Sequence, residues 1–173
     1  MVRIPKPEPD EYLAYYGKYI ALVGADALSA LRAQSAGTPR LLSGVTESQA
    51  MFRYAPGKWC VKEVLGHVID GERVFGYRAL RFAREDRTPL AGFDENEWVP
   101  AAKFDRRPLQ ELVAEYVSVR AATVAMFSSF DTQALARRGA ANGAEVSVRA
   151  LAHIIAGHEL HHVGLLRERY GLA

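Results

Sequence analysis

The sequence predicts an all-α protein, an up-down four-helix bundle with long connecting loops. Apolar residues recur at three- and four-residue spacing in four long stretches, the pattern of amphipathic helices. No stretch shows the strict alternation that a half-buried strand needs, so strand content should be near zero. Four such helices bury their apolar stripes against one another in a bundle. We expect residues 1–173 to form a single domain.

The first part of the chain should hold an extended lead-in, the first long helix and a short helix. Proline alternates with charged residues at the start, which favours extended backbone. Helical periodicity follows, and Thr46 with Gln49 three residues later matches a capping box at a helix start. The expected segments are the lead-in at 1–9, a helical stretch at 10–32 with a break at Gly24, a loop at 35–44 and a short helix at 48–52.

Two more long helices are expected in the middle of the chain. The second covers residues 61–84 and has Cys60 where serine or threonine would usually cap the first turn. Its main apolar stripe leaves His67 on another face of the helix, together with Arg78. The third helix begins at Pro108, because proline suits the first turn of a helix.

The connection between these two helices, residues 85–107, is long for a compact domain. Connections of this length are often functional. One short helical turn is expected near residues 95–101. Phe93 and Trp98 within the connection either cover a pocket or simply pack on the bundle.

Composition and charge are those of an ordinary soluble protein and exclude several classes of function. Hydrophobic residues make up 49% and charged residues 24% of the chain. The net charge of +2 and the lack of a lysine and arginine run argue against a nucleic-acid partner. The single cysteine suits a reducing compartment. No apolar run could span a bilayer or serve as a signal peptide, so a cytoplasmic location without a membrane partner is expected.

The last helix holds the most distinctive feature of the sequence, four of the protein's five histidines. A glycine- and alanine-rich loop at 131–146 precedes it, and Ser147 is its expected N-cap. The apolar spacing of residues 147–170 continues through His158 and His162, which lie about 40° apart around a helix. Imidazoles in place of core residues are typical of the ligands of a buried metal.

Residues 158–162 read HELHH and also match the H-E-x-x-H pattern of zinc metalloproteases. That pattern needs a third ligand, but Leu165 and Glu168 stand where the metzincin extension has glycine and histidine. A metalloprotease therefore remains only a remote alternative. A ligand pair through His161 is geometrically possible, although His162 is closer in angle to the first histidine.

A third ligand has to come from upstream, where His67 lies in the middle of a helix. A lone histidine there would more often be a satisfied core residue. Facing helices of a bundle can, however, bring it against His158 and His162, and three neutral imidazoles with open positions make a catalytic type of metal site. His153 is about 140° from His158 around the helix and is not an expected ligand.

The segment GKWCVKEVLGHVIDGERVFGYRALRFAREDRTPLAGFDENEWV, paired with AHIIAGHELHH near the C-terminus, resembles the DinB-like superfamily in its YfiT branch. There a Gly-Lys-Trp segment precedes a helix with H-x-x-D-x-E, and the last helix carries H-E-x-H-H. The resemblance covers most of the chain. It implies a four-helix bundle, frequent homodimers and one divalent metal held by residues that match His67, His158 and His162. The chain departs from the family at Cys60, where serine is usual.

The resemblance implies a metal-dependent enzyme that activates water or a low-molecular-weight thiol, that is, a hydrolase or a thiol transferase with a small-molecule substrate. Zinc and nickel both suit an all-nitrogen ligand set. The alternative is a non-catalytic module in which the metal staples the helices or serves in a stress response. No residue is assigned as the general base, since Glu159 should point away from the neighbouring ligand on a helix.

Polar residues near the expected ligands could support them or line the pocket. Asp70 and Glu72 follow His67 by one turn, and a metal-bound histidine usually donates its second N–H to a carboxylate or carbonyl. Arg120 falls on an apolar stripe, where an unpaired buried charge is costly, so either it pairs with Glu72 or Asp70 or these charges extend to the surface. His161 either borders the pocket or lies at the surface.

Overall fold

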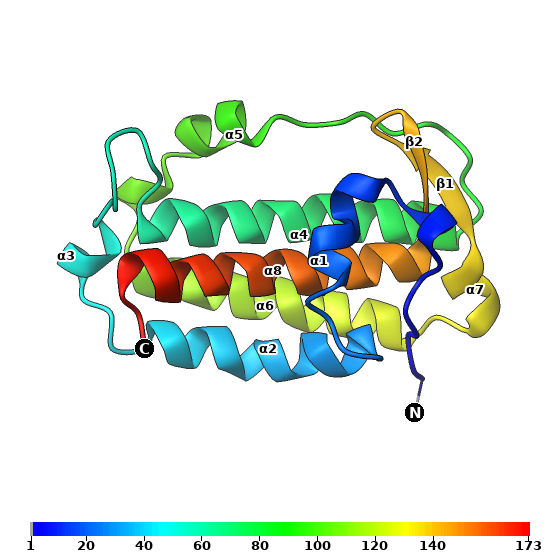
Figure 1. Ribbon diagram of the computed structural model, residues 1–173, viewed down its shortest axis with the longest axis horizontal. Helices are drawn as coiled ribbons and strands as arrows, with labels where there is room; N and C mark the ends of the chain where they lie inside the picture. The colour runs from blue at the N-terminus through cyan, green and yellow to red at the C-terminus, as the bar shows by residue number, and fades with distance from the viewer. Residues whose placement is uncertain (1) are drawn as a thin grey trace.

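Four long helices form the body of the protein in the computed structural model, which describes residues 2–173 (Figure 1). Helix α4 packs against both α6 and α8, and α2 packs against the same two helices from the opposite side. The predicted all-α four-helix bundle is confirmed. The four helices are α2 (Ala27–Leu42), α4 (Val61–Ala83), α6 (Leu109–Ser128) and α8 (Val148–Tyr170).

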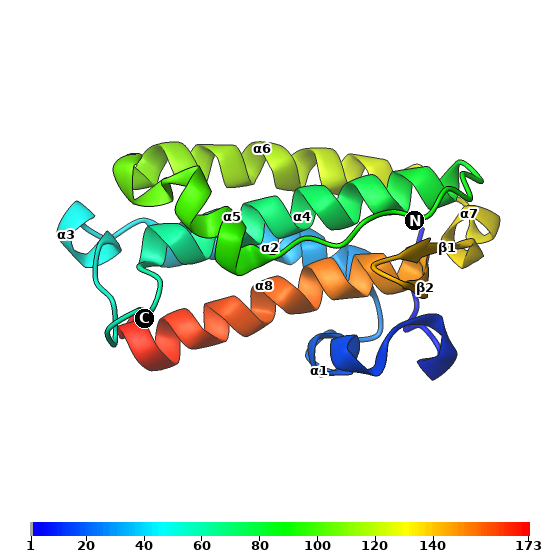
Figure 2. The same ribbon diagram turned by 90° about the horizontal axis from the view of Figure 1, so that it is seen from above.

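The helices do not alternate strictly in direction, as the colours of Figures 1 and 2 show. Helices α2 and α8 run one way, and α4 and α6 run the other way. The connection between α4 and α6 therefore returns along the bundle and ends near the start of α4, where Lys62 Nζ lies 3.4 Å from the Asp105 carbonyl oxygen. It carries α5 (Glu95–Ala102) and the short 3-10 helix η3 (Phe104–Arg106).

The first long helix begins later than predicted. The break expected at Gly24 is present, but the continuous helix up to residue 32 and the loop at 35–44 are wrong, because α2 starts after Asp26 and continues to Leu42. Asp26 has extended backbone, and its carboxylate accepts hydrogen bonds from the Leu28 and Ile4 N–H groups. Asp26 is thus the N-cap of α2 and separates this helix from the segment before it. The segment before it contains η1 (Pro9–Glu11), η2 (Ala14–Tyr16) and α1 (Gly17–Ile20).

The N-terminal lead-in, predicted at residues 1–9, has neither helix nor strand from residue 2 to residue 8 and is fixed to the bundle, whereas residue 1 lies outside the described residues and Pro9 begins η1. Ile4 is completely buried, and its carbonyl oxygen accepts a hydrogen bond from the Ala27 N–H at 3.0 Å. The same oxygen lies 3.1 Å from His153 Nε2 on α8. These contacts tie the lead-in to two of the four long helices.

The predicted helix starts at Thr46, Cys60 and Ser147 are confirmed. The Thr46 hydroxyl accepts from the Gln49 N–H in the capping box of α3 (Glu47–Ala50), and the Ser147 hydroxyl accepts from the Ala150 N–H at the start of α8. Cys60 is the N-cap of α4. The short helix expected near 95–101 is α5.

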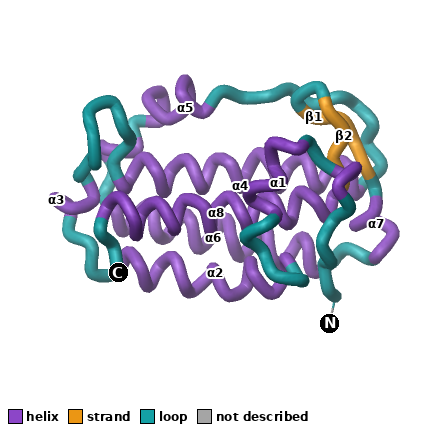
Figure 3. The backbone as a smooth tube through the Cα atoms, in the orientation of Figure 1, coloured by secondary structure: helices purple, strands orange, loops and turns teal. Residues whose placement is uncertain are grey.

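The expectation of almost no strand needs a small correction. Residues 131–146, predicted as a loop, contain α7 (Thr132–Ala136) and an antiparallel hairpin of β1 (Arg138–Ala141) and β2 (Ala144–Ser147) (Figure 3). Asn142 and Gly143 both have positive φ, at 53° and 77°. Two such residues in a row make the turn that matches strand twist, so this Asn-Gly pair was the missed signal.

The buried apolar residues fall into two clusters along the bundle, with polar residues between them. On α4, Glu72 lies between Ile69 of one cluster and Phe75 of the other. On α6, Arg120 likewise separates Tyr116 from Phe127. A polar layer therefore crosses the middle of the bundle. Among residues 2–173, no helix combines the length and apolar character needed to cross a membrane.

Candidate metal centre

Three buried imidazoles meet between α4 and α8, the two helices with the most extensive mutual packing. His158 Nε2 lies 2.9 Å from His67 Nε2 and 3.1 Å from His162 Nε2. One ring nitrogen from each residue can be chosen so that all three lie within 4.8 Å of one another. The structure thus brings together the three histidines that the sequence singled out.

Local packing explains why the rings converge. On α8 the i and i+4 positions of His158 and His162 share a face, and the antiparallel α4 presents His67 to that face. Gly71 leaves space for the His158 ring, since a Cβ there would lie 3.1 Å from its Cε1 atom. Gly157 lets α1 approach closely, because a Cβ there would lie 2.1 Å from the Tyr19 carbonyl oxygen. The Tyr19 ring then packs edge-on against His158.

Burial keeps these histidines neutral. It lowers the pKa of His67 to about 4, although the nearby Glu95 carboxylate opposes the shift. Burial and the neighbouring rings lower the pKa values of His158 and His162 well below the usual range. All three imidazoles therefore carry no charge near pH 7, which is the protonation state of a metal ligand.

The hydrogen-bonding capacity of the three rings fits a cation better than it fits the rings alone. A neutral imidazole has one N–H donor and one lone pair. His158 Nε2 contacts two other Nε2 atoms at once, and it can satisfy only one of them as donor or acceptor. A cation between the rings would accept all three lone pairs, and imidazole nitrogen suits zinc, nickel, copper and iron.

The other two histidines of α8 lie outside the cluster. The His161 ring is half-buried, with its centroid 5.4 Å from that of Tyr19 and 5.1 Å from that of His162. His153 is fully buried and contacts the Ile4 carbonyl oxygen. His161 therefore borders the site, and His153 has a structural place, as its angle on the helix predicts.

Arg120 lies at the centre of the polar layer and joins all four long helices. It is fully buried, and its Nε and Nη2 atoms donate to the two oxygens of Glu72 at 2.9 and 2.8 Å. Nη2 also donates to Glu159 on α8, and Nη1 donates to Gln34 on α2. Burial opposes its charge, but the bonds and charges of the two glutamates outweigh this and raise the pKa of Arg120. The predicted pair with Glu72 is present.

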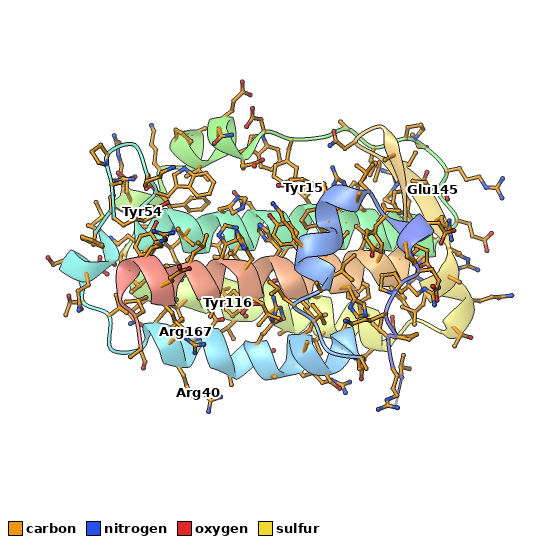
Figure 4. The ribbon with its side chains drawn as sticks, viewed as in Figure 1. Tyr15, Arg40, Tyr54, Tyr116, Glu145 and Arg167 are labelled. Carbon is orange, nitrogen blue, oxygen red and sulfur yellow. The ribbon has the colours of Figure 1, made fainter. Side chains whose placement is uncertain are left out.

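Glu159 belongs to this network and not to the histidine cluster. It is 1% exposed and accepts hydrogen bonds from Arg120, Thr38 and the Tyr116 hydroxyl. Tyr116, labelled in Figure 4, brings the α6 side of the same network. The carboxylate that a protease would use as general base is therefore held by Arg120, Thr38 and Tyr116, on another face of α8 from His158.

The carboxylates expected beside the ligands bind other groups. Asp70 pairs with Arg73 at 3.6 Å, and Glu72 pairs with Arg120. The Nδ1 atom of His162 is buried and has no hydrogen-bond partner among residues 2–173. Asp70 and Glu72, the two candidates for such support, therefore form no hydrogen bond with the three histidines in the described part of the chain.

A cavity of about 310 Å³ opens onto His67 and His158. We call it the first cavity. Its walls are mainly aromatic and come from α4, the segment before α2 and the start of α5. The lining residues include Tyr15, Tyr16, Tyr19, Phe75, Arg78, Phe93 and Glu95. Phe93 thus covers the site, as one of our two expectations had it, whereas the exposed Trp98 packs against the Phe93 ring.

A second cavity, of about 250 Å³, reaches His162. Tyr54, Lys58, Trp59 and Asn96 are among its lining residues. Figure 4 shows Tyr15 of the first cavity and Tyr54 of the second well apart along the bundle. The Trp59 ring also packs on His67, with centroids 4.9 Å apart. The histidine cluster therefore borders two separate spaces.

Sequence reasoning missed Tyr19 and Glu95 as site residues, and it did not use Arg78. Tyr19 and Glu95 come from segments that approach α4 only in the folded chain, so no local pattern marks them. Arg78 shares a helix face with His67, and the spacing of these two residues in the sequence indicates this. Cys60 is fully buried, and burial raises the pKa of its thiol, so it is a packed helix cap and not a nucleophile.

Comparison with known proteins places the chain in a family. The sequence model of the DinB superfamily matches residues 30–166. This range includes all of α4 and α8 up to Leu166, and therefore all three histidines of the cluster. The chain belongs to the DinB superfamily. A relative from Geobacillus kaustophilus (strain HTA426), named "Putative metal-dependent hydrolase", is 26% identical over 149 residues, which are 83% of this chain and 84% of that one.

A solved structure shows the same fold as this DinB superfamily member. YfiT from Bacillus subtilis, described as "a probable metal-dependent hydrolase with an unusual four-helix bundle topology", superposes with a TM-score of 0.74. The match covers 97% of this chain and 95% of YfiT, at 18% identity. At 18% sequence identity, this structural similarity establishes that the two proteins share a fold.

Proposed function

We propose that this protein is a metal-dependent hydrolase in which His67, His158 and His162 hold one divalent cation, zinc or nickel. The observation that carries the proposal is the convergence of three buried imidazoles at the edge of the first cavity. The names of the Geobacillus and Bacillus relatives point to the same chemistry. The substrate would be a small molecule, because the first cavity has the size of a small-molecule site.

A divalent ion held here would supply Lewis acidity and lower the pKa of a coordinated water or thiol. The chain itself contributes three neutral nitrogens, kept neutral by burial. Tyr19 and Phe75 pack against His158 and keep bulk water from that side of the ring. Glu95 is the one carboxylate among the residues lining the first cavity, and we assign it the role of proton acceptor.

A second candidate function is transfer of a low-molecular-weight thiol, and the second cavity favours it. A hydrolase needs room for one organic substrate, whereas a transferase must hold two. The two cavities reach different histidines of the same cluster, so two reactants could approach it separately. A non-catalytic role, in which the ion only staples α4 to α8, is the remaining alternative.

Metal content tests the ligand assignment. Protein purified without chelator should carry about one equivalent of zinc or nickel by elemental analysis. His67→Ala, His158→Ala and His162→Ala should each lose most of it, because two imidazoles hold such an ion weakly. His161→Ala is the matched control and should keep the metal, since its ring lies outside the cluster. Full metal content in all three ligand variants would show that the assignment is wrong.

Turnover separates the three functions. Metal-loaded protein is incubated with ester, amide and electrophilic substrates, with and without cysteine, bacillithiol or glutathione. Hydrolysis without a thiol supports the hydrolase, and thiol consumption supports the transferase. Metal-dependent thermal stabilisation without any turnover would favour the staple, because ligand binding to the folded state alone raises stability.

A further inference from the structure

Arg78 is a buried cation without a counter-charge at the wall of the first cavity. It is 4% exposed, and Nη2 donates a hydrogen bond to the Ala91 carbonyl oxygen at 2.8 Å. The Phe75 and Phe93 rings lie beside its guanidinium, with centroids 5.6 and 6.0 Å from Cζ. Tyr16 is its other polar neighbour. Across residues 2–173, no carboxylate forms an ion pair with it.

The contrast with Arg120 shows that this arrangement is unusual within the protein. Both side chains are buried, but Arg120 binds two glutamates, and their charges raise its pKa. At Arg78, burial lowers the pKa, and only Tyr16 opposes the shift. A buried charge that meets only neutral groups is energetically costly. Arg78 therefore has an unused capacity to bind an anion.

The position of Arg78 relates it to the histidine cluster. Gly71, which touches His158, and Arg78 lie on the same α4 face that carries His67, and both His158 and Arg78 line the first cavity. Arg78 follows Gly71 by seven positions, which is about 10 Å along a helix. The Phe75 ring lies between them, within 6.2 Å of the His158 ring centroid. The cavity thus has a cluster of ligands at one end and a guanidinium at the other, with an apolar wall between.

We infer that the first cavity binds a small carboxylate with an apolar body, whose carboxylate pairs with Arg78 and whose far end reaches His67 and His158. A guanidinium presents two parallel N–H groups that match one carboxylate. The aromatic walls suit an apolar body about as long as the distance between Arg78 and the histidine end of the cavity. Glu95 in the same cavity disfavours a doubly charged group such as a phosphate. The inference rests on the proposed function only for the metal chemistry at the histidine end of the cavity.

Binding to the metal-free protein tests the inference apart from the metal. Chelator-treated protein is titrated calorimetrically with ω-phenyl carboxylates from phenylacetate to 5-phenylpentanoate, with the matching amides and with 2-phenylethyl phosphate. A carboxylate should bind roughly 10- to 100-fold more tightly than its amide, the effect of hydrogen bonds to a charged group. Arg78→Met should remove this preference. Arg87→Met, an exposed arginine outside the cavity, should keep it.

Other outcomes decide against the inference. Equal binding of carboxylate and amide, tighter binding of the phosphate, or no binding by any carboxylate would each overturn it. So would a preference that survives Arg78→Met. If that variant does not fold, Arg78→Lys keeps the charge without the fork and should weaken carboxylate binding while retaining the preference over the amide. Loss of metal binding in the histidine variants with unchanged carboxylate binding leaves the inference standing and concerns the proposed function alone.

Discussion

At the residue scale, the candidate site depends on small residues as much as on histidines. Glycine at 71 and 157 permits contacts that any Cβ would crowd, and both contacts position His158 or the tyrosine against it. Interiors are packed as densely as organic crystals, so a shift of a few tenths of an ångström at one ring is transmitted to its neighbours. The absence of a side chain at Gly71, on the facing helix α4, therefore helps to set the geometry of the cluster.

Substituting Gly71 should weaken metal binding without unfolding the protein. In Gly71→Ala the new methyl would lie 3.1 Å from His158 Cε1, so the His158 ring must shift and its placement relative to the other two rings changes. We expect a loss of metal affinity on the order of tenfold, comparable to loss of an outer partner of a ligand. Competition titration with a chromophoric chelator measures it.

Gly76→Ala is the matched control, because its methyl would meet only Met126 Cε at 3.9 Å. Alanine is the better helix former, so this variant should be about 0.4–1 kcal/mol more stable and bind metal normally. Equal metal affinities for the two variants would contradict the role given to Gly71.

At the scale of elements, long helices supply ligands and short segments complete the site around them. The lead-in, α1 and α5 cover faces of α4 and α8 that a bare bundle would expose to water. His153 joins the lead-in to α8 through the Ile4 carbonyl oxygen. Burial lowers the pKa of His153, although the hydrogen bond to Ile4 opposes the shift, so the ring is neutral in the folded protein over a wider pH range than in the unfolded chain.

This histidine should make the metal-free protein sensitive to acid. The unfolded chain takes up a proton below about pH 6.5, whereas the folded chain takes it up only at lower pH. Stability therefore falls as pH drops below about 6.5 and levels off below the folded pKa. Urea midpoints at several pH values measure this slope. His153→Gln keeps a donor for Ile4 and should flatten the slope by up to one proton, about 1.4 kcal/mol per pH unit. An unchanged slope would contradict the assignment.

At the scale of the whole molecule, one buried charge network fixes how the four long helices meet. Arg120 binds partners on α2, α4 and α8, and Glu159 adds a bond from Thr38 and a bond from Tyr116. The ligands His158 and His162 lie on the same helix as Glu159. The network on one side of α8 therefore fixes the register of α8 against α4. The convergence of the histidines, on another side of α8, depends on that register.

Removing Arg120 should destabilise the whole fold. Arg120→Met leaves two glutamates buried without their cation, and breaking such a pair costs about 3–5 kcal/mol of unfolding free energy. Denaturant unfolding followed by circular dichroism measures the change. Arg73→Met is the matched control, because Arg73 is 48% exposed and pairs with Glu115 near the surface, where such pairs contribute about 1 kcal/mol or less. A loss no larger than that of the control would refute the network's role.

The sequence by itself determined the elements whose information is local. Periodicity and capping residues placed α3, α4, α5, α6 and α8, and the spacing of His67, His158 and His162 marked the candidate ligands. The start of α2 was misplaced although Asp26, which accepts a local hydrogen bond from the Leu28 N–H, marks it as an N-cap. The hairpin was missed although its Asn-Gly pair was a local signal.

Only the tertiary structure decided which polar groups serve the site and which hold the fold. Glu159 and His158 are adjacent in sequence, yet one enters the charge network and the other the histidine cluster. Arg120 and Arg78 are both buried in the folded protein, but folding gives Arg120 two carboxylates and leaves Arg78 at the wall of a cavity. The partners of a buried charge come from helices far away in sequence, so periodicity within one helix cannot reveal them.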